Sequence, residues 1–245
     1  MLTNKIALIT GGNSGIGYAT AEVLKAQGAD VIITGRREQA LQEAAASLGV
    51  KGYVADQSKL ADIEQLAAQV KGDYGRVDIL FINAGISKVF PIEGADESQL
   101  DEIMDINFKG AFFTLSRFIP LLPDGATVIF LSSIVAQFYG HSSSIYSASK
   151  AALNAVMKTA ALELAPRKIR VNAVSPGPTK TEVMAKSGYP EEVLRQTREG
   201  LISRIPLHRM AEAEEIGKLV AFLASADNAA FITGSEFVID GGITI

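Results

Sequence analysis

The chain has 245 residues and a mass of 26.0 kDa, with 23 Lys and Arg against 27 Asp and Glu, a net charge of −4 and an isoelectric point of about 5.3. This balance disfavours nucleic acid as a partner, because phosphate binding needs a concentrated positive surface. The chain has no cysteine and two histidines, which excludes disulfides and a cysteine nucleophile and leaves no usual ligand set for a catalytic zinc ion. Hydrophobic residues make up 48% of the chain, enough to fill a substantial core.

Short apolar runs alternate along the chain with longer segments that have the spacing of amphipathic helices. Most of the short runs are continuous, as in strands that are buried on both faces. In chain order we expect strand 6–10, helix 16–27, strand 31–34, helix 37–48, strand 52–55, helix 59–74, strand 78–83, helix 98–119, strand 127–132, helix 145–165, strand 170–174, helix 212–225 and strand 236–239. Such alternation predicts a doubly wound α/β fold of Rossmann type, with a seven-stranded parallel sheet and helices on both faces.

No linker, repeat or change of composition divides the chain, so we expect a single domain over residues 1–245. Segment 175–211 shows no strand pattern and is too long for a passive connection. We expect it to form a substrate lid over about 177–211. The apolar run at the N-terminus is too short for a signal peptide, and no stretch reaches the ~20 apolar residues of a membrane span. We therefore expect a cytoplasmic protein with no membrane partner.

A glycine-rich loop joins the first expected strand to the first expected helix. It reads Thr-Gly-Gly-Asn-Ser-Gly-Ile-Gly over residues 10–17. Glycines let a backbone approach a diphosphate, and a helix N-terminus offers free N–H groups and the positive end of its dipole. The spacing differs from the G-x-G-x-x-G fingerprint, so the loop alone is compatible with nucleotide binding and with a plain turn.

Four side chains in the second half of the chain could take part in catalysis. Tyr146 and Lys150 are four residues apart and share a helix face, so the ammonium would lower the Tyr146 pKa toward neutrality and make the phenol a general acid or base. Ser132 and Ser133 end the fifth expected strand, where ligands bind in open α/β sheets. Taken alone, the Tyr-x-x-x-Lys spacing is more typical of a surface Tyr and a solvated Lys. The Ser pair alone is equally compatible with a cap on a turn.

Taken together and in this order, these elements resemble the short-chain dehydrogenase/reductase family over the whole chain. Segment 10–17 is similar to the family's cofactor glycine motif, and Ser133 fits its catalytic serine because it lies thirteen residues before Tyr146. Further matches are Asn83-Ala84-Gly85, Asn107, Lys150, the P-G-x-x-x-T motif at 176–181 and the D-G-G motif at 240–242. The resemblance implies hydride transfer between a nicotinamide cofactor and a carbonyl or secondary alcohol.

The resemblance also implies the role of each residue. Tyr146 would donate a proton to the carbonyl oxygen, Ser133 would hydrogen-bond that oxygen, and Lys150 would hold the nicotinamide ribose. Asn107 would position a water that relays protons to Lys150. Asp56 would contact adenine, although Gln57 follows it where the family usually has an apolar residue. The expected cofactor-binding residues are Gly11, Asn13, Ser14, Ile16, Gly17, Arg36, Arg37, Asp56, Gln57, Asn83, Ala84, Gly85, Tyr146, Lys150, Pro176, Gly177, Thr179 and Thr181, with no metal.

The end of the second expected strand predicts the choice of cofactor. An NAD enzyme places a carboxylate there for the ribose 2′-hydroxyl, but this chain reads Thr34-Gly35-Arg36-Arg37. Arg36 could pair with a 2′-phosphate, and an arginine at a helix N-terminus otherwise opposes the helix dipole. We therefore expect NADP(H), with NAD(H) as the less favoured cofactor.

The loops expected around the nicotinamide predict the substrate class. They are mainly apolar, which suits alkyl or aryl ketones better than sugars, whose hydroxyls would be left without partners. The expected wall residues are Ile86, Val89, Phe90, Ile134, Val135, Phe138, Tyr139, Met184, Tyr189, Leu201 and Ile205. We interpret His141 and His208 as ordinary polar residues.

Other functions remain open at this stage. A 3-oxoacyl-carrier-protein reductase has the same motifs but needs a basic docking patch, for which Arg167 and Lys168 are the candidates. A sugar or steroid dehydrogenase is also compatible with the motifs. A cofactor-binding sensor without catalysis would be expected to lack Ser133, Tyr146 or Lys150, and all three are present.

The sequence also predicts self-association. Helix 145–165 is rich in small residues, and the chain ends in the apolar tail Ile243-Thr244-Ile245. In the family both features lie at subunit interfaces, so the resemblance implies a homotetramer.

Overall fold

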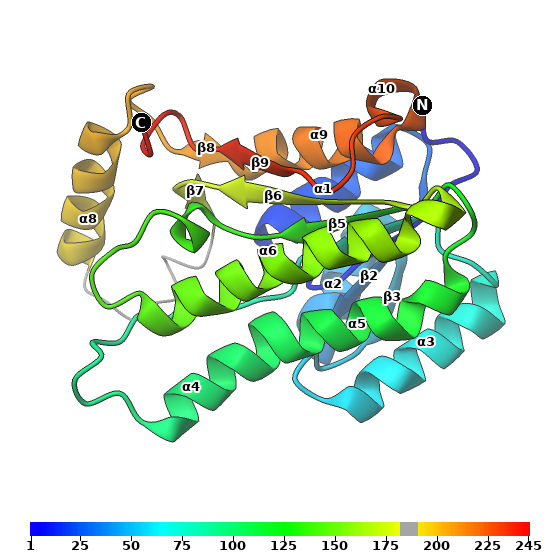
Figure 1. Ribbon diagram of the computed structural model, residues 1–245, viewed down its shortest axis with the longest axis horizontal. Helices are drawn as coiled ribbons and strands as arrows, with labels where there is room; N and C mark the ends of the chain where they lie inside the picture. The colour runs from blue at the N-terminus through cyan, green and yellow to red at the C-terminus, as the bar shows by residue number, and fades with distance from the viewer. Residues whose placement is uncertain (182–190) are drawn as a thin grey trace.

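Seven parallel strands form the central sheet of the computed structural model, which describes residues 1–181 and 191–245 (Figure 1). Their order across the sheet is β3-β2-β1-β4-β5-β6-β9. The strands are β1 Ile6–Ile9, β2 Asp30–Gly35, β3 Lys51–Val54, β4 Ile79–Ile82, β5 Thr127–Leu131, β6 Arg170–Pro176 and β9 Glu236–Ile239. The predicted seven-stranded parallel sheet is therefore confirmed.

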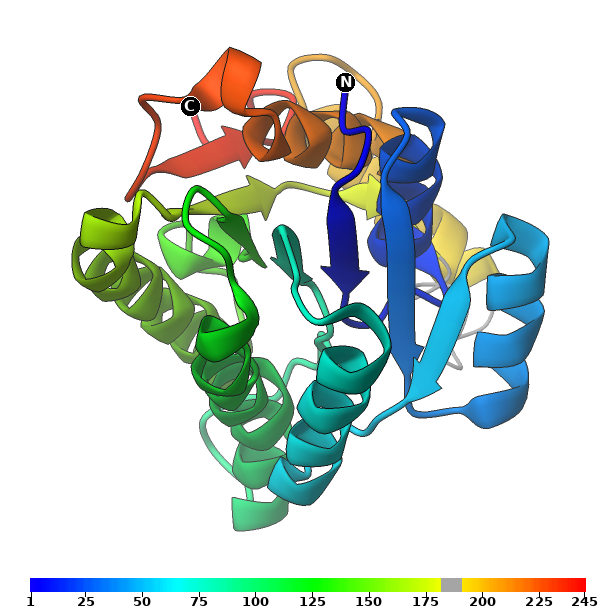
Figure 2. The same ribbon diagram turned by 90° about the vertical axis from the view of Figure 1, so that its right-hand side faces the viewer.

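Helices cover both faces of this sheet (Figures 1 and 2). Helices α1, α2 and α9 bury their apolar residues against one face, and α3, α5 and α6 bury theirs against the other. The helices are α1 Gly15–Ala26, α2 Glu38–Leu48, α3 Leu60–Tyr74, α4 Glu97–Met104, α5 Ala111–Phe118, α6 Ser144–Leu164, α8 Glu191–Arg204, α9 Ala213–Ala224 and α10 Ala226–Ala229. This is the doubly wound, Rossmann-type arrangement expected from the sequence.

Strand β1 shows why the apolar runs are continuous. Leu8 belongs to the core on one face of the sheet, whereas its neighbours Ala7 and Ile9 belong to the core on the other. All three side chains are fully buried, so neither face tolerates a polar residue at these positions. The strand order reverses on either side of β1, and such a switch point leaves a crevice at the carboxyl ends of the strands.

The helix predicted over 98–119 is interrupted. Helix α4 ends at Met104, a π-helical turn spans Asp105–Gly110, and α5 then continues to Phe118. The π turn holds Asn107, whose side chain is fully buried and turned toward the loop after β4. The prediction of one regular helix was wrong, because spacing alone does not distinguish an α turn from a π turn.

Segment 175–211 also differs from expectation. Strand β6 continues to Pro176, and β7 (Thr179–Lys180) pairs in parallel with β8 (Ala211–Glu212) to form a second, two-stranded sheet. Helix α8 lies between these two short strands along the chain. The prediction that this segment has no strand was wrong, because β7 and β8 come together only through a contact between residues distant in sequence.

Candidate active site

The carboxyl ends of the strands open into one cleft of about 1490 Å³. Its walls come from the loop after β1, the ends of β2 to β6 and the start of α6. Nearly all residues predicted to bind cofactor or carry catalysis line it, and the two exceptions are Gly17 and Asn107. The fold thus brings together groups that are up to about 170 residues apart, from Gly11 to Thr181.

Two glycines of the loop after β1 are required by close approach. A Cβ on Gly11, whose φ is +65°, would lie 2.9 Å from the Cα of Ala84. A Cβ on Gly17 would lie 2.3 Å from the carbonyl oxygen of Gly11. Gly17 therefore shapes the loop from behind, which explains why it does not line the cleft.

Asn83 holds the same loop in place through hydrogen bonds. Its amide nitrogen donates to the carbonyl oxygens of Thr10 at 2.8 Å and Gly11 at 3.0 Å. In return, the Thr10 hydroxyl accepts hydrogen bonds from the backbone N–H groups of Asn83 and Ala84, both at 3.0 Å. The Asn-Ala-Gly segment thus fixes the glycine loop in addition to lining the cleft.

The N-terminus of α1 is free to bind an anion. Ser14 is the N-cap residue, but its side chain makes no capping hydrogen bond within the described residues, and the first turn has no acidic side chain. The N–H groups at this end therefore lack an intrahelical or side-chain acceptor, and the helix dipole favours negative charge here. A diphosphate fits these donors.

Arg36, Arg37 and Asp56 give the far end of the cleft its charge. Burial alone would raise the pKa of Asp56, but hydrogen bonds from Ser58 and the charges of Arg36 and Lys59 hold it below its ordinary value. No other Asp or Glu among the described residues lines the cleft. Arg36 directly follows β2, whose carboxyl end at Thr34 and Gly35 carries no carboxylate.

Gln57 lies beside Asp56 in the cleft wall. Its Nε2 atom is buried and has no hydrogen-bond partner within the described residues. Buried amide donors are almost always paired, so this orphaned donor fits a ligand that brings an acceptor, such as the ring nitrogens of adenine.

Lys150 lies deep in the cleft, close to Tyr146. Its Nζ donates to the carbonyl oxygen of Leu131 at 2.8 Å and lies 5.9 Å from the centroid of the Tyr146 ring. The side chain is almost fully buried, and burial lowers the Lys150 pKa to about 8. The Lys150 ammonium therefore loses its proton at a lower pH than an exposed lysine does.

Tyr146 is half-buried at the start of α6. Burial raises the Tyr146 pKa, although hydrogen bonding to the hydroxyls of Ser133 and Ser87 opposes the shift. The expected lowering of this pKa by Lys150 was wrong in direction, because the cost of burying a phenolate outweighs the stabilising contacts. The phenol consequently keeps its proton at neutral pH.

Ser87 was missed by the sequence analysis. It follows the Asn-Ala-Gly segment by two residues and lines the cleft with Tyr146. Its closeness to a strand end was the one available signal, since polar side chains at that edge of the sheet tend to face the ligand.

Asn107 acts on the loop that carries Ser87. Its Oδ1 accepts the Ile86 N–H at 2.8 Å, and its Nδ2 donates to the Ile86 carbonyl at 2.9 Å and to the Ser149 hydroxyl at 3.1 Å. Ser149 in turn donates to the Tyr146 carbonyl at 2.7 Å. The Asn107 side chain is thus engaged by protein groups and ties the loop after β4 to the start of α6.

Known proteins share this architecture and sequence. A profile of the family described as enoyl-(acyl carrier protein) reductase matches residues 11–244. The chain is 36% identical to the 3-oxoacyl-(acyl-carrier-protein) reductase FabG of Thermotoga maritima, over 100% of this chain and 99% of that protein. It is 35% identical to the 3α-hydroxysteroid dehydrogenase of Mediterraneibacter gnavus, over 98% of this chain and 97% of that protein. The chain belongs to the short-chain dehydrogenase/reductase family.

A solved structure supports the same assignment. A Brucella melitensis protein described as a short-chain dehydrogenase/reductase, glucose/ribitol dehydrogenase, has a TM-score of 0.93 at 31% identity, over 100% of this chain and 98% of that chain. Members of this family are oxidoreductases that use a nicotinamide cofactor and small-molecule substrates. The free N-terminus of α1 and the orphaned Gln57 amide both fit such a dinucleotide.

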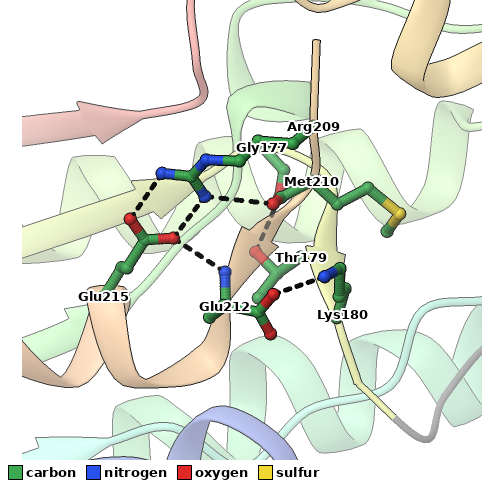
Figure 3. A network of polar contacts seen from close by, with 7 residues as sticks. All are labelled: Gly177, Thr179, Lys180, Arg209, Met210, Glu212 and Glu215. Carbon is green, nitrogen blue, oxygen red and sulfur yellow. Dashed lines mark hydrogen bonds and ion pairs between the residues drawn. The ribbon is translucent and has the colours of Figure 1, made fainter. Parts of the chain in front are cut away.

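The segment that follows β6 is held at its base by polar contacts, which Figure 3 shows. Arg209 binds Glu215 through both terminal nitrogens at 2.7 Å, and Glu215 also accepts the Glu212 N–H at 2.9 Å. Lys180 forms an ion pair with Glu212. The Thr179 hydroxyl donates to the Gly177 carbonyl at 3.0 Å. These contacts fix the two ends of the segment beside the cleft.

The terminal Asp-Gly-Gly motif supports the same region from behind. A Cβ on Gly177 would lie 2.7 Å from the Cα of Asp240, so only glycine allows this approach. Asp240 in turn accepts hydrogen bonds from the N–H groups of Gly242 at 2.9 Å and Thr244 at 3.2 Å. The C-terminal tail is thereby folded back toward the cleft, which Ile243 helps to line.

The substrate end of the cleft is only partly as expected. Eight of the predicted apolar wall residues line it: Ile86, Val89, Phe90, Ile134, Val135, Phe138, Tyr139 and Leu201. Ile205 is instead buried, and a Cβ on Gly241 would lie 2.7 Å from its Cγ2, so its assignment to the wall was wrong. Met184 and Tyr189 lie outside the described residues. Ser87, Lys88, His141, Arg204, Met210 and Ile243 also line the cleft and were not predicted to do so.

The described residues offer neither a metal-binding cluster nor a membrane-spanning helix. Within residues 1–181 and 191–245, no group of three or more His, Asp or Glu side chains is placed to hold a metal ion. In the same ranges, no helix is both long and apolar enough to cross a membrane.

Proposed function

We propose that this protein is an NADP(H)-dependent ketoreductase that reduces free alkyl or aryl ketones. The observation that carries the proposal is the convergence of Tyr146, Ser133 and Lys150 on one cleft whose opposite end holds Arg36. NADPH, when bound, supplies the hydride.

The chain's own residues supply the proton and hold the reacting oxygen. Tyr146 donates its phenolic proton to the carbonyl oxygen. Its raised pKa keeps the phenol protonated, as this step requires. Ser133 hydrogen-bonds the same oxygen as negative charge develops on it. Lys150 places a positive charge behind the phenol and holds the ribose, and Asn107 positions the loop after β4 through Ile86.

NADP(H) is favoured over NAD(H) by charge. Arg36 and Arg37 line the adenosine end, where β2 offers Gly35 in place of a carboxylate. A guanidinium pairs well with a phosphate, whereas a ribose 2′-hydroxyl has no acceptor here on β2.

A second candidate is 3-oxoacyl-carrier-protein reduction, which the likeness to the Thermotoga maritima enzyme favours. Docking of an acidic carrier protein would need a free basic patch. Arg167 is engaged, however: it donates to Asp124 at 3.1 Å, to the Ile119 carbonyl at 3.2 Å and to the Leu122 carbonyl. Of the two candidate docking residues only the exposed Lys168 is then left, which ranks the carrier-protein substrate below a free ketone.

A homotetramer is part of the proposal. Ala148, Ala151 and Ala155 are exposed along α6, and the large apolar side chains of Leu162 and Ile245 are exposed as well. Exposed apolar surface of this kind marks sites of protein association. Light scattering at micromolar concentration tests it, and a particle of 26.0 kDa would contradict it. The cytoplasmic location and the lid over 177–211 stay predictions.

The function is tested by a panel assay. The purified protein is incubated with NADPH or NADH and with alkyl ketones, aryl ketones, a sugar, a steroid and a 3-oxoacyl-carrier-protein thioester, and the loss of reduced cofactor is followed by absorbance. We expect turnover of the alkyl and aryl ketones with NADPH. Turnover confined to the thioester, the sugar or the steroid would reject the substrate assignment, and a preference for NADH would reject the cofactor assignment.

A further inference from the structure

The substrate end of the cleft carries basic side chains and, among the described residues, no acidic ones. The sole Asp or Glu among the described residues of the cleft wall is Asp56, at the adenosine end. The wall near the catalytic residues instead carries Lys88, His141 and Arg204. This is unexpected in a chain with a net charge of −4, in which acidic side chains outnumber basic ones. The cleft therefore concentrates positive potential where the substrate would lie.

Lys88 is already neutralised. Its Nζ lies 2.6 Å and 2.8 Å from the two carboxylate oxygens of Glu102, which is not part of the cleft wall. His141 is exposed. Among the described residues of this end, and apart from the catalytic Lys150, the positive charge without an ion-pair partner is that of Arg204.

Arg204 differs from its arginine neighbours along the chain. Arg195 on the same helix pairs with Glu192 and Glu199, each at 2.7 Å, and Arg209 pairs with Glu215 at 2.7 Å. Within residues 1–181 and 191–245, Arg204 makes no ion pair and no hydrogen bond, although carboxylates are frequent in this segment. All five of its N–H donors are thus available at the cleft wall.

Arg204 lies next to apolar residues of the cleft wall. It closes α8 one turn after Leu201, and Met210 and Ile243 complete the same wall. The next residue, Ile205, is buried and its backbone N–H donates to the Ile202 carbonyl at 3.2 Å, so the end of the helix is anchored. A ligand that contacts this apolar wall therefore has a guanidinium beside it, carried by an anchored helix end.

We propose that the substrate carries a carboxylate at the end remote from its reacting carbonyl, and that Arg204 binds this carboxylate. The inference rests on the proposed function and narrows it from apolar ketones to ketones with an apolar body and an anionic terminus. A planar guanidinium matches a carboxylate with two parallel hydrogen bonds, and a neutral ketone leaves these donors to water.

The test compares two ketones that differ only in charge. Para-acetylbenzoate and its methyl ester are reduced by the full-length enzyme with saturating NADPH, and kcat/KM is measured for each. We expect wild type to prefer the acid by roughly tenfold at low salt, with the preference falling as ionic strength rises. Arg204→Gln should abolish this preference by raising KM for the acid far more than KM for the ester.

Arg198→Gln is the matched control. Arg198 is exposed on the same helix but does not line the cleft, so this variant should keep the wild-type preference. Equal use of acid and ester by wild type, or the same loss in both arginine variants, would overturn the role of Arg204 while leaving ketone reduction intact. If neither ketone is reduced although NADPH binds, the proposed function itself fails, and the inference fails with it.

Discussion

Replacement of Lys150 by methionine tests whether burial of the charged Lys150 amine lowers the stability of the folded protein. Lys150 is 3% exposed, and burial lowers its pKa from 10.5 to about 8. At ~1.4 kcal/mol per pKa unit, this shift corresponds to about 3 kcal/mol of folding free energy lost while the amine is charged. The charge is penalised in the folded chain, so the cost is fully present below about pH 8 and disappears above about pH 10.5.

The expected result is a difference in stability that changes with pH. Between about pH 7 and about pH 9.5, the free energy of unfolding of wild type should rise by about 2 kcal/mol relative to Lys150→Met. At neutral pH, the difference in unfolding free energy between wild type and Lys150→Met is smaller than about 3 kcal/mol, because the variant also loses the hydrogen bond to the Leu131 carbonyl. This loss offsets about 1–3 kcal/mol of the stability that the variant gains. The change with pH is therefore the diagnostic quantity.

Urea unfolding without cofactor, followed by far-ultraviolet circular dichroism at fixed protein concentration, measures it. Lys158→Met is the matched control, because Lys158 is exposed on the same helix. Its difference from wild type should stay constant across the same pH range. A Lys150→Met difference that also stays constant would show that the buried amine does not titrate there, and would refute the reasoning.

Three further outcomes are expected. Tyr146→Phe should lower turnover by roughly 10²–10³-fold while NADPH still binds, as measured by steady-state kinetics and by cofactor fluorescence; half-maximal activity would contradict its role as proton donor. Arg36→Asp should weaken NADPH binding and improve the use of NADH, as judged from the ratio of kcat/KM for the two cofactors. Gln57→Leu should weaken binding of NADPH by roughly fivefold in calorimetry, whereas an unchanged dissociation constant would show that the buried amide does not contact adenine.

Much of the fold was predictable because its signals are local. The continuous run of Ala7, Leu8 and Ile9 reports burial on both faces of a sheet, whatever the rest of the chain does. The glycine loop and the Tyr-x-x-x-Lys spacing likewise need no tertiary contact to be recognised. Except for Gly17, the residues predicted from these motifs accordingly line one cleft.

The features that were missed all depend on contacts between distant segments. The π turn at Asn107 accompanies two hydrogen bonds to Ile86, 21 residues earlier. The pairing of β7 with β8 joins Thr179 to Ala211. Ser87 and Arg204 have no motif, and they become visible only once the fold places them on the wall of the same cleft.

The pKa of Tyr146 shows how burial can reverse an argument made from spacing. Tyr146 and Lys150 do share a helix face, yet burial raises the pKa of the phenol and lowers that of the ammonium to about 8. Both shifts disfavour charge, so at neutral pH the phenol keeps the proton that carbonyl reduction consumes. Alcohol oxidation needs the phenolate, which forms only at higher pH. For the proposed ketoreductase we therefore expect carbonyl reduction to be fastest at neutral pH and alcohol oxidation to be fastest in alkali, while the equilibrium of the reaction is unchanged.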